Sequence, residues 1–285
     1  MTRIIGIGAG KYIINQVLYR GGFSTVYEGR KIGSSEPVVI RQLKEGSTGK
    51  ERSVFQNGVD VHQLLDPESR RFPKLYDHSG DVSALQHIDG RQLTDYGRQK
   101  EEIALAVAYE LADCLDEFHR SDKRHIVHRD VKPPNILVRK QDGETWLVLI
   151  DFDLGFIRGR ADPARGIFTR GYAAPEQMEG RAARLETDIY SVGSTLYHVL
   201  TGSNPRPVVW EDDHRRKVFV EPNMEGVDQK SRAGKVIANC WRMNGHQYES
   251  AEHLRDDVGK KMKGMGIKKA DIPKILGRMR VRQKV

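Results

Sequence analysis

The octapeptide at 128–135, His-Arg-Asp-Val-Lys-Pro-Pro-Asn, limits more than any other stretch how this chain can fold. Short apolar runs at 126–127 and 136–138 lie on either side of it. This arrangement predicts a polar loop between two buried segments. Pro133 and Pro134 restrict the backbone of the loop, so the spacing of its charged side chains is fixed.

Three side chains of this loop have the chemistry that phosphoryl transfer requires. Asp130 can accept the proton of an attacking hydroxyl, and Lys132 can offset charge on the moving phosphoryl group. Asn135 can supply an oxygen to Mg²⁺. A charged surface turn is the alternative, and the match of all eight residues together with their apolar flanks argues against it.

The octapeptide resembles the catalytic loop of the eukaryotic-like protein kinases, and a lysine two residues after the aspartate is similar to the Ser/Thr branch of that superfamily. The resemblance implies an α+β, bilobal fold that uses ATP and Mg²⁺. Residues 1–86 would form a β-rich N-lobe with a glycine-rich loop, a five-stranded sheet and one helix. Residues 87–259 would form a larger helical C-lobe, and residues 260–285 a basic C-terminal tail.

Within the expected N-lobe, residues 18–29 resemble the kinase glycine-rich loop. Gly21 keeps the middle glycine, whereas Ser24 stands at the third and Tyr19 at the first. A bulky Tyr19 would crowd the approach of the backbone to phosphate. Residues 1–11 also contain glycines, but a phosphate-binding glycine loop needs a helix after them, so these residues are expected to be a lead-in segment.

The cation expected to grip the α- and β-phosphates is Arg41, where the family carries lysine. It lies in a predicted strand at 37–43. Arginine keeps the charge but has a planar, forked head, so the exchange is not conservative. The resemblance also places Gly58, on a predicted helix at 53–65, where a glutamate should pair with this cation. Both members of the ion pair are altered together, which leaves two hypotheses: a rewired site or a decayed one.

Two short apolar strands, at 72–76 and 82–85, lead into a polar connector between the expected lobes. By resemblance Leu85 is the gatekeeper, and the backbones of Gln86 and Ile88 hydrogen-bond adenine. The full set of residues that the resemblance assigns to nucleotide binding is Leu18, Gly21, Gly22, Val26, Val39, Arg41, Gln86, Ile88 and Leu137.

An apolar strand at 146–150 delivers two acids, Asp151 and Asp153. An acid at the end of such a strand suits chelation of Mg²⁺ between phosphates. Asp151 is the preferred metal ligand because the strand then ends where the family's strand ends, which makes 151–153 an altered DFG motif. Asp153 stays the alternative, since its register would preserve the glycine of the motif.

Residues 151–176 resemble the activation segment of the family. Thr169 falls where Ser/Thr kinases place a threonine that bonds the catalytic aspartate and lysine. Residues 152–168 contain no Ser, Thr or Tyr, so Arg129 of the catalytic loop has no phosphorylated partner there. We expect Asp162 to take that place, and activation not to depend on phosphorylation in this stretch.

Two further positions are expected to support the catalytic loop and the end of the activation segment. Asp188 opens a predicted helix at 187–200, and by resemblance it holds the loop backbone, while an ordinary helix cap is the alternative. Gln247 stands where an arginine usually pairs with Glu176. Either Arg242 replaces that arginine, or Glu176 is less firmly supported.

The net charge of +8 is concentrated at the C-terminus. Residues 260–285 contain ten Lys and Arg residues against one acid, a net +9, which leaves the rest of the chain at −1. Such a tail suits contact with an acidic partner, a membrane surface or nucleic acid. A solvated helix and tail end is the plainer alternative.

No apolar run approaches the length of a membrane span, and the N-terminus lacks the apolar stretch of a signal peptide. Cys114 and Cys240 lie in helix-like apolar settings, which favours reduced core thiols and a cytoplasmic location. The sequence therefore favours a Ser/Thr protein kinase that phosphorylates a protein substrate. The alternative is a pseudokinase that acts as a nucleotide-binding or scaffolding regulatory module.

Overall fold

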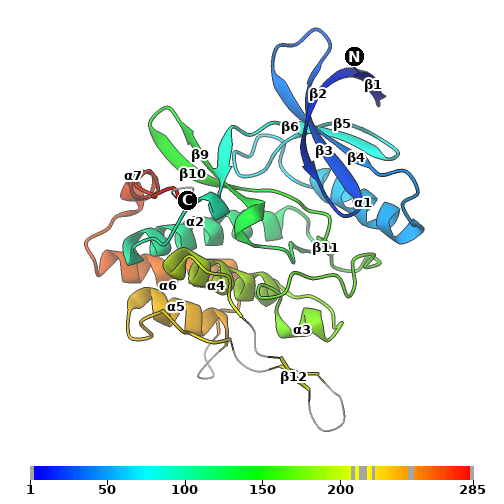
Figure 1. Cartoon of the computed structure of the whole chain (residues 1–285). Coiled ribbons are helices and arrows are strands. Elements are labelled where there is room, and N and C mark those ends of the chain that lie inside the picture. The colour runs from blue at the N-terminus through cyan, green and yellow to red at the C-terminus, as the bar shows by residue number, and fades with distance from the viewer. Residues whose placement is uncertain (1–2, 207–208, 212–216, 220–221, 243–246, 283–285) are drawn as a thin grey trace.

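The computed structural model describes residues 3–206, 209–211, 217–219, 222–242 and 247–282. One sheet of six strands, with a helix beside it, forms a smaller unit at the N-terminal end of the described chain, and most of the helices build a larger unit after it (Figure 1). This is the α+β, two-lobed arrangement that the sequence predicts.

The N-lobe is built on one antiparallel sheet with the strand order β1-β2-β3-β4-β6-β5. Its strands are β1 (Arg3–Ile7), β2 (Gly10–Arg20), β3 (Ser24–Lys31), β4 (Pro37–Leu43), β5 (Leu75–Ser79) and β6 (Val82–Gln86). Successive residues of β4 point to opposite faces of the sheet. Val38 and Ile40 are buried on one face, and the other face carries Val39 and Arg41.

The sheet has six strands, one more than the five predicted, because residues 3–7 form β1. β1 pairs with β2, and Ile7 lies opposite Gly10 next to the turn. Gly8 permits this tight turn, since its φ of +55° lies in the left-handed region that glycine favours. Ile7 is fully buried. The expectation that residues 1–11 are a lead-in segment was therefore wrong, because the apolar residues there pair as a strand.

Helix α1 (Gly49–His62) is the one helix among residues 3–86, the described part of the N-lobe (Figure 1). Thr48 and Glu51 form a capping box: Thr48 Oγ1 accepts a hydrogen bond from Glu51 N at 3.2 Å, and Glu51 Oε2 accepts one from Thr48 N at 2.7 Å. Phe55 of the helix shares a buried cluster with Leu43 of β4. α1 is thereby fixed beside the strand that carries the predicted phosphate-binding cation.

The C-lobe is a helical unit in which α2 packs against α4, α6 and α7, and α4 packs against α5. Its helices are α2 (Glu101–Arg120), α3 (Pro175–Met178), α4 (Leu185–Thr201), α5 (Arg232–Cys240), α6 (Ala251–Lys263) and α7 (Ile272–Leu276). Cys114 and Cys240 are free and fully buried within this core, and burial raises the pKa of the Cys114 thiol to about 12. Within the described part of the chain, no helix combines the length and apolar character needed to cross a bilayer.

Short strands and turns complete the described chain after the N-lobe. They are β7 (Gly90–Gln92), β8 (Ile126–Val127), β9 (Ile136–Gln141), β10 (Glu144–Leu149), β11 (Phe156–Ile157), β12 (Val209–Glu211) and β13 (Lys217–Phe219), with the 3₁₀ turns η1 (Leu93–Asp95), η2 (Pro133–Asn135) and η4 (Lys269–Asp271). β8 ends directly before the octapeptide 128–135, and β9 begins directly after it. The two apolar flanks are therefore strands, and the loop between them is held at both ends.

The basic tail packs its apolar residues on the C-lobe and leaves most of its charged side chains exposed to solvent. Ile272, Leu276 and Met279 are buried in the main core, next to α2 and β10. Arg282 N donates to Asp95 O at 2.8 Å and so ties the end of the described chain to η1. Cationic side chains can remain in water while apolar residues at helical spacing pack inward. The plainer alternative of a solvated tail thus holds for the charged side chains, while the apolar residues of the tail belong to the core.

Candidate functional site

The backbone of the catalytic loop is held by Asp188 at the start of α4. Asp188 Oδ2 accepts a hydrogen bond from His128 N, and Oδ1 accepts one from Arg129 N, each at 2.7 Å. His119 Nε2 lies 2.8 Å from Asp188 Oδ2, and the Asp188 side chain is completely buried. Arg129 has a φ of +66°, a conformation that a non-glycine residue rarely adopts unless its surroundings fix it. The structure thus places Asp188 in the supporting position predicted for it.

Asp130 lies at the centre of a buried hydrogen-bond network. Thr169 Oγ1 donates to Asp130 Oδ1 at 2.7 Å, and Asn135 Nδ2 donates to Asp130 Oδ2 at 2.9 Å. Lys132 Nζ lies 2.7 Å from Asp130 Oδ2 and 2.9 Å from Thr169 Oγ1. The catalytic loop and the activation segment therefore bring all three predicted catalytic residues into contact. Because each contact restrains one oxygen or the other, the orientation of the carboxylate is determined.

The two predicted metal ligands offer oxygen atoms, which Mg²⁺ prefers. Asn135 uses its amide nitrogen for Asp130, so those hydrogen bonds leave its side-chain oxygen unused. Asp151 follows β10 with a φ of +66° and is exposed. In the described ranges, no group of three or more His, Cys, Asp and Glu side chains could hold a metal ion by itself. The donor set fits an ion that takes its remaining ligands from substrate phosphates and water.

Asp153, the alternative metal ligand, pairs with Arg41 instead. Arg41 Nη2 donates to Asp153 Oδ2, and the two side chains are only 10% and 7% exposed. The guanidinium also lies over the Phe55 ring, 5.2 Å from its centroid. Burial raises the pKa of the Asp153 carboxyl above its usual range, and the charge of Arg41 opposes this rise only in part. The sequence offered both aspartates as ligands, and the structure leaves Asp151 as the accessible one.

Three predicted nucleotide-pocket residues, Val26, Val39 and Arg41, share one face of the N-lobe sheet with Leu85. Val26 lies directly opposite Arg41 between β3 and β4, and Val39 lies directly opposite Leu85 between β4 and β6. Residues directly opposite each other in antiparallel strands point to the same face. Residues 39 and 41 also share a face, so these four side chains line it together.

The tip of the glycine-rich loop is closed by a turn in which Gly21 N donates to Ser24 O at 2.9 Å. Lys44 Nζ donates to the carbonyl oxygens of Gly21 and Gly22 at 2.6 and 2.8 Å. Lys44 lies just after β4 and belongs to no sequence motif, so the sequence did not indicate its role. The Tyr19 side chain is 65% exposed, yet its ring would lie 3.2 Å from a Cβ at Gly21. The aromatic ring therefore lies close to the turn, and a side chain at position 21 would fit only tightly beside it.

The remaining predicted pocket residues lie at the strand ends and between the lobes. Leu18 is 45% exposed near the end of β2, whereas Ile88 is 8% exposed and shares a buried cluster with Val148. Leu137 of β9 is half-buried and packs against the same cluster.

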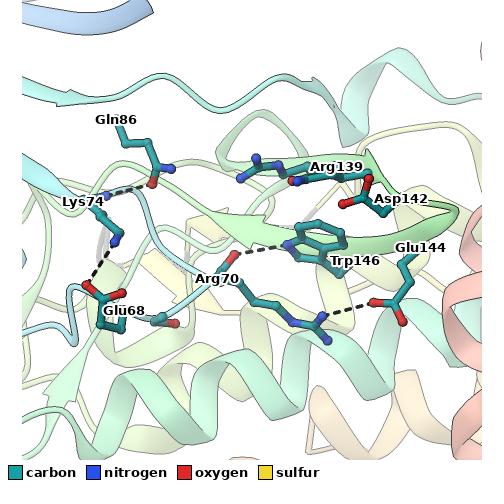
Figure 2. A pocket seen from close by; sticks show the side chains of 10 residues that line it. Glu68, Arg70, Lys74, Gln86, Arg139, Asp142, Glu144 and Trp146 are labelled. Atoms are coloured by element: carbon teal, nitrogen blue, oxygen red, sulfur yellow. Dashed lines mark hydrogen bonds and ion pairs between the residues drawn. The ribbon is translucent and has the colours of Figure 1, made fainter. Parts of the chain in front are cut away.

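The hinge residue Gln86 turns its side chain away from the expected adenine side. Gln86 N donates to Lys74 O at 2.8 Å, and Gln86 Oε1 accepts from Lys74 N at 3.3 Å. Figure 2 shows the side chain of Gln86 beside Lys74, at the edge of a hollow that Trp146 also lines. The hollow has a volume of about 520 Å³. Two ion pairs, Lys74 with Glu68 at 3.1 Å and Arg70 with Glu144 at 3.3 Å, occupy much of its charged lining. With its N–H taken, Gln86 can offer only its carbonyl oxygen to a base.

The activation segment is fixed to the catalytic loop without a phosphate. Arg129 Nη1 donates to Asp162 Oδ2 at 2.7 Å and Arg129 Nη2 to Asp162 Oδ1 at 2.9 Å. Gln177 Nε2 adds a bond to Arg129 O at 2.9 Å, which the sequence did not indicate. The prediction that Asp162 is the partner of Arg129 is confirmed.

The far end of the segment is fixed by Glu176, which is 1% exposed. Arg242 donates to both of its oxygens at 3.1 and 3.2 Å, and Thr187 Oγ1 donates to Oε1 at 2.7 Å. Burial alone would raise the pKa of Glu176, but these hydrogen bonds outweigh it and lower the pKa. Arg242 therefore replaces the arginine that is absent at Gln247, as the sequence analysis considered.

A β-sheet lobe, a helical lobe and a loop that presents Asp, Lys and Asn between them define a kinase-type fold. The chain belongs to the protein kinase family: residues 12–257 match the model of the protein kinase domain.

The curated relatives are serine/threonine-protein kinases. PknB of Mycolicibacterium smegmatis is 26% identical over 294 residues, which cover 93% of this chain and 45% of that protein. Serine/threonine-protein kinase D of Synechocystis sp. is 29% identical over 266 residues, which cover 86% of this chain and 51% of that protein. The chain thus spans about half the length of the curated relatives that it matches.

Solved kinase domains share the fold. The BubR1 kinase domain superposes with a TM-score of 0.66 and 16% identity over 96% of this chain and 88% of that one. The Mycobacterium tuberculosis PknI kinase domain does so with a TM-score of 0.65 and 19% identity over 90% of this chain and 98% of that one. At such identities the likeness supports the fold alone.

Proposed function

We propose that this chain is an active Ser/Thr protein kinase, which transfers the γ-phosphoryl group of ATP to a hydroxyl of a protein substrate. The observation that carries the proposal is the network around Asp130, in which Thr169 and Asn135 each hold one of its oxygens. A site that had lost its activity would have no need to keep this carboxylate oriented from two separate segments.

In the proposed reaction Asp130 orients the substrate hydroxyl and accepts its proton as the phosphoryl group moves. Lys132 offsets the charge that develops on the phosphoryl oxygens, and Thr169 connects both residues to the segment where the substrate would lie. Asn135 and Asp151 would hold Mg²⁺, which neutralises phosphate charge when bound.

We propose that the nucleotide lies between the lobes, with its base beneath the sheet face that carries Val26 and Val39. Leu18 and Leu137 would enclose the base from above and below, and Gln86 O and Ile88 N would hydrogen-bond its edge. Gly21 and Gly22 would cover the phosphates, and Arg41 would contact them. The free, fully buried thiols of Cys114 and Cys240 support a cytoplasmic location for this activity.

Among the partners considered for the tail, we propose an acidic protein segment that carries an apolar side chain. A hollow of about 480 Å³ lies between α2, α6 and α7, lined by Tyr109, Gly259, Met262, Lys263, Gly266, Ile267, Lys268, Lys269 and Ile272. Lys263, Lys268 and Lys269 form no ion pair with a described residue. An apolar hollow with a cationic rim favours one inserted side chain flanked by acids over a flat membrane surface or a nucleic acid.

The tail proposal can be tested with a labelled random copolymer of Glu and Tyr. Reversing all three rim charges to Glu should weaken its binding at least about tenfold, since each exposed pair contributes up to about 1 kcal/mol. Equal binding by both proteins would contradict the proposal, as would binding to phosphatidylserine vesicles without binding to the copolymer.

A phosphotransfer assay tests the proposed activity. The purified chain is incubated with γ-labelled ATP, Mg²⁺ and a generic basic protein, with α-labelled ATP as the control. The proposal predicts label on Ser or Thr of the substrate only with the γ-label and only with Mg²⁺. Absence of label, together with a thermal shift produced by ATP, would instead support the pseudokinase alternative.

A further inference from the structure

The buried carboxylate that faces Arg41 comes from the activation segment and not from α1. Asp153 stands two residues after Asp151, at the glycine position of the altered DFG motif. Its Oδ2 accepts a hydrogen bond from Arg41 Nη2, and both side chains are almost entirely buried. A buried guanidinium without a counter-charge would be strongly unfavourable, so this pair is a requirement of the folded site.

Gly58 on α1 makes room for that carboxylate. A Cβ at position 58 would lie 3.1 Å from Asp153 Cγ and still closer to Oδ1, so a side chain there would collide with the acid. Glycine in the middle of a helix weakens the helix, and Gly58 is not needed for a turn. The close approach of Asp153 supplies the reason for this glycine. Asp153 Oδ1 is itself buried and makes no hydrogen bond with any residue that the structure describes.

The neighbouring residue of α1 ties the helix to the same segment. Asn57 Nδ2 donates to Asp153 O at 3.0 Å and to Gly155 O at 2.7 Å. Three positions of the chain, 41, 58 and 153, thus depart from the family pattern in ways that fit one another sterically and electrostatically. A decayed site would not be expected to show this compensation, because each change would have occurred without regard to the others.

We propose that Asp153 is a positioning residue that orients Arg41 toward the nucleotide phosphates, in the role expected of a glutamate on α1. The proposal rests on the kinase function proposed above and deepens it. One consequence concerns regulation: the ion pair depends on the conformation of residues 151–155, so a rearrangement there breaks it even when α1 stays in place.

The test moves the carboxylate from one element to the other. Asp153→Gly removes the carboxylate that faces Arg41. Gly58→Glu adds a carboxylate on α1 while Asp153 still occupies the space. The double variant Gly58→Glu/Asp153→Gly places a single carboxylate on α1. The readouts are the Kd of a Mg²⁺-bound non-hydrolysable ATP analogue and the KM and kcat of phosphotransfer. Thermal unfolding checks that each variant folds.

Asp153→Gly should weaken binding of the analogue at least about tenfold, because it leaves Arg41 buried without a partner. The double variant should recover most of the lost affinity, whereas Gly58→Glu alone should bind the analogue more weakly than the wild type does. If the double variant binds no better than Asp153→Gly, the proposal is overturned, since a purely structural role of Asp153 would not be rescued by a carboxylate on α1.

If the double variant does not fold, Asp153→Asn decides the question, because it keeps the shape and removes the charge. A Kd within about twofold of the wild type, a free-energy difference under about 0.5 kcal/mol, would then overturn the proposal. The binding readout also separates this proposal from the proposed function. Suppose that the Kd values of the wild type and the variants follow the predicted order, but the wild type transfers no phosphate. This result would contradict the kinase function and leave the positioning role intact.

Discussion

Asp162 should be the residue that keeps the activation segment folded onto the catalytic loop, and Asp162→Ala tests this directly. The carboxylate forms two parallel hydrogen bonds with Arg129, at 2.7 and 2.9 Å. The two side chains are 14% and 4% exposed, so solvent screens the pair only slightly. Arg129 Nε also donates to Leu154 O at 2.6 Å, which holds the guanidinium in place after the carboxylate is removed.

The expected cost is large for a single substitution. Removing one partner of a buried ion pair destabilises a protein by about 3–5 kcal/mol. Two hydrogen bonds to charged groups, each contributing about 1.5–3 kcal/mol, give a similar range. A domain has a free energy of unfolding of only about 5–15 kcal/mol, so Asp162→Ala should shift the denaturant midpoint clearly.

Urea unfolding followed by circular dichroism measures this effect. The double variant Arg129→Ala/Asp162→Ala should cost less than the sum of the single variants by about 1–3 kcal/mol. Glu179→Ala is the matched control, because its pair with Arg181 is exposed and should contribute under about 1 kcal/mol. A coupling energy below about 0.5 kcal/mol would refute the reasoning. So would a loss of wild-type activity on phosphatase treatment that is traced to Thr169.

Three further predictions concern stability. Burial lowers the pKa of His62 to about 4, so between about pH 6.5 and 4 the unfolded chain binds a proton that the folded chain does not, and the free energy of unfolding falls as the pH falls. In His62→Phe the free energy of unfolding, measured with urea, should depend less on pH in this window. Equal pH dependence in the two proteins would contradict the prediction. Leu276→Ala should lower the free energy of unfolding by about 2–5 kcal/mol, and a loss below about 1 kcal/mol would show that α7 does not belong to the core. Arg242→Gln should remove the ion pair that lowers the pKa of buried Glu176. As the pH falls below about 4.5, the free energy of unfolding should therefore fall more in the wild type than in the variant. An equal fall in both proteins would contradict this.

The sequence predicted the catalytic loop well because its information is local. Asp130, Lys132 and Asn135 lie within six residues, and two prolines and two flanking strands fix their geometry. Asp162 was also predictable, since the absence of Ser, Thr and Tyr at 152–168 left an acid as the partner for Arg129.

The ion pair of Arg41 could not be predicted in the same way. Gly58 and Asp153 are 95 positions apart in the chain. Taken alone, Gly58 is explained as a lost glutamate and Asp153 as a second candidate metal ligand. Only their tertiary contact shows that the acid fills the space the glycine leaves. The packing of the tail could not be predicted either. Its charges are evident in the sequence, whereas the packing of Ile272 and Leu276 depends on surfaces contributed by α2 and β10.

The comparison of wild type with Asp130→Asn in γ-phosphoryl transfer tests the central claim most directly. The substitution keeps the size of the side chain and its hydrogen-bonding neighbours but removes the proton acceptor. At saturating ATP and Mg²⁺, the initial rate should fall by about 10²–10⁴-fold while the Kd of the ATP analogue stays nearly unchanged. Equal rates in the two proteins would contradict the assignment of Asp130 and, with it, the proposed catalytic site.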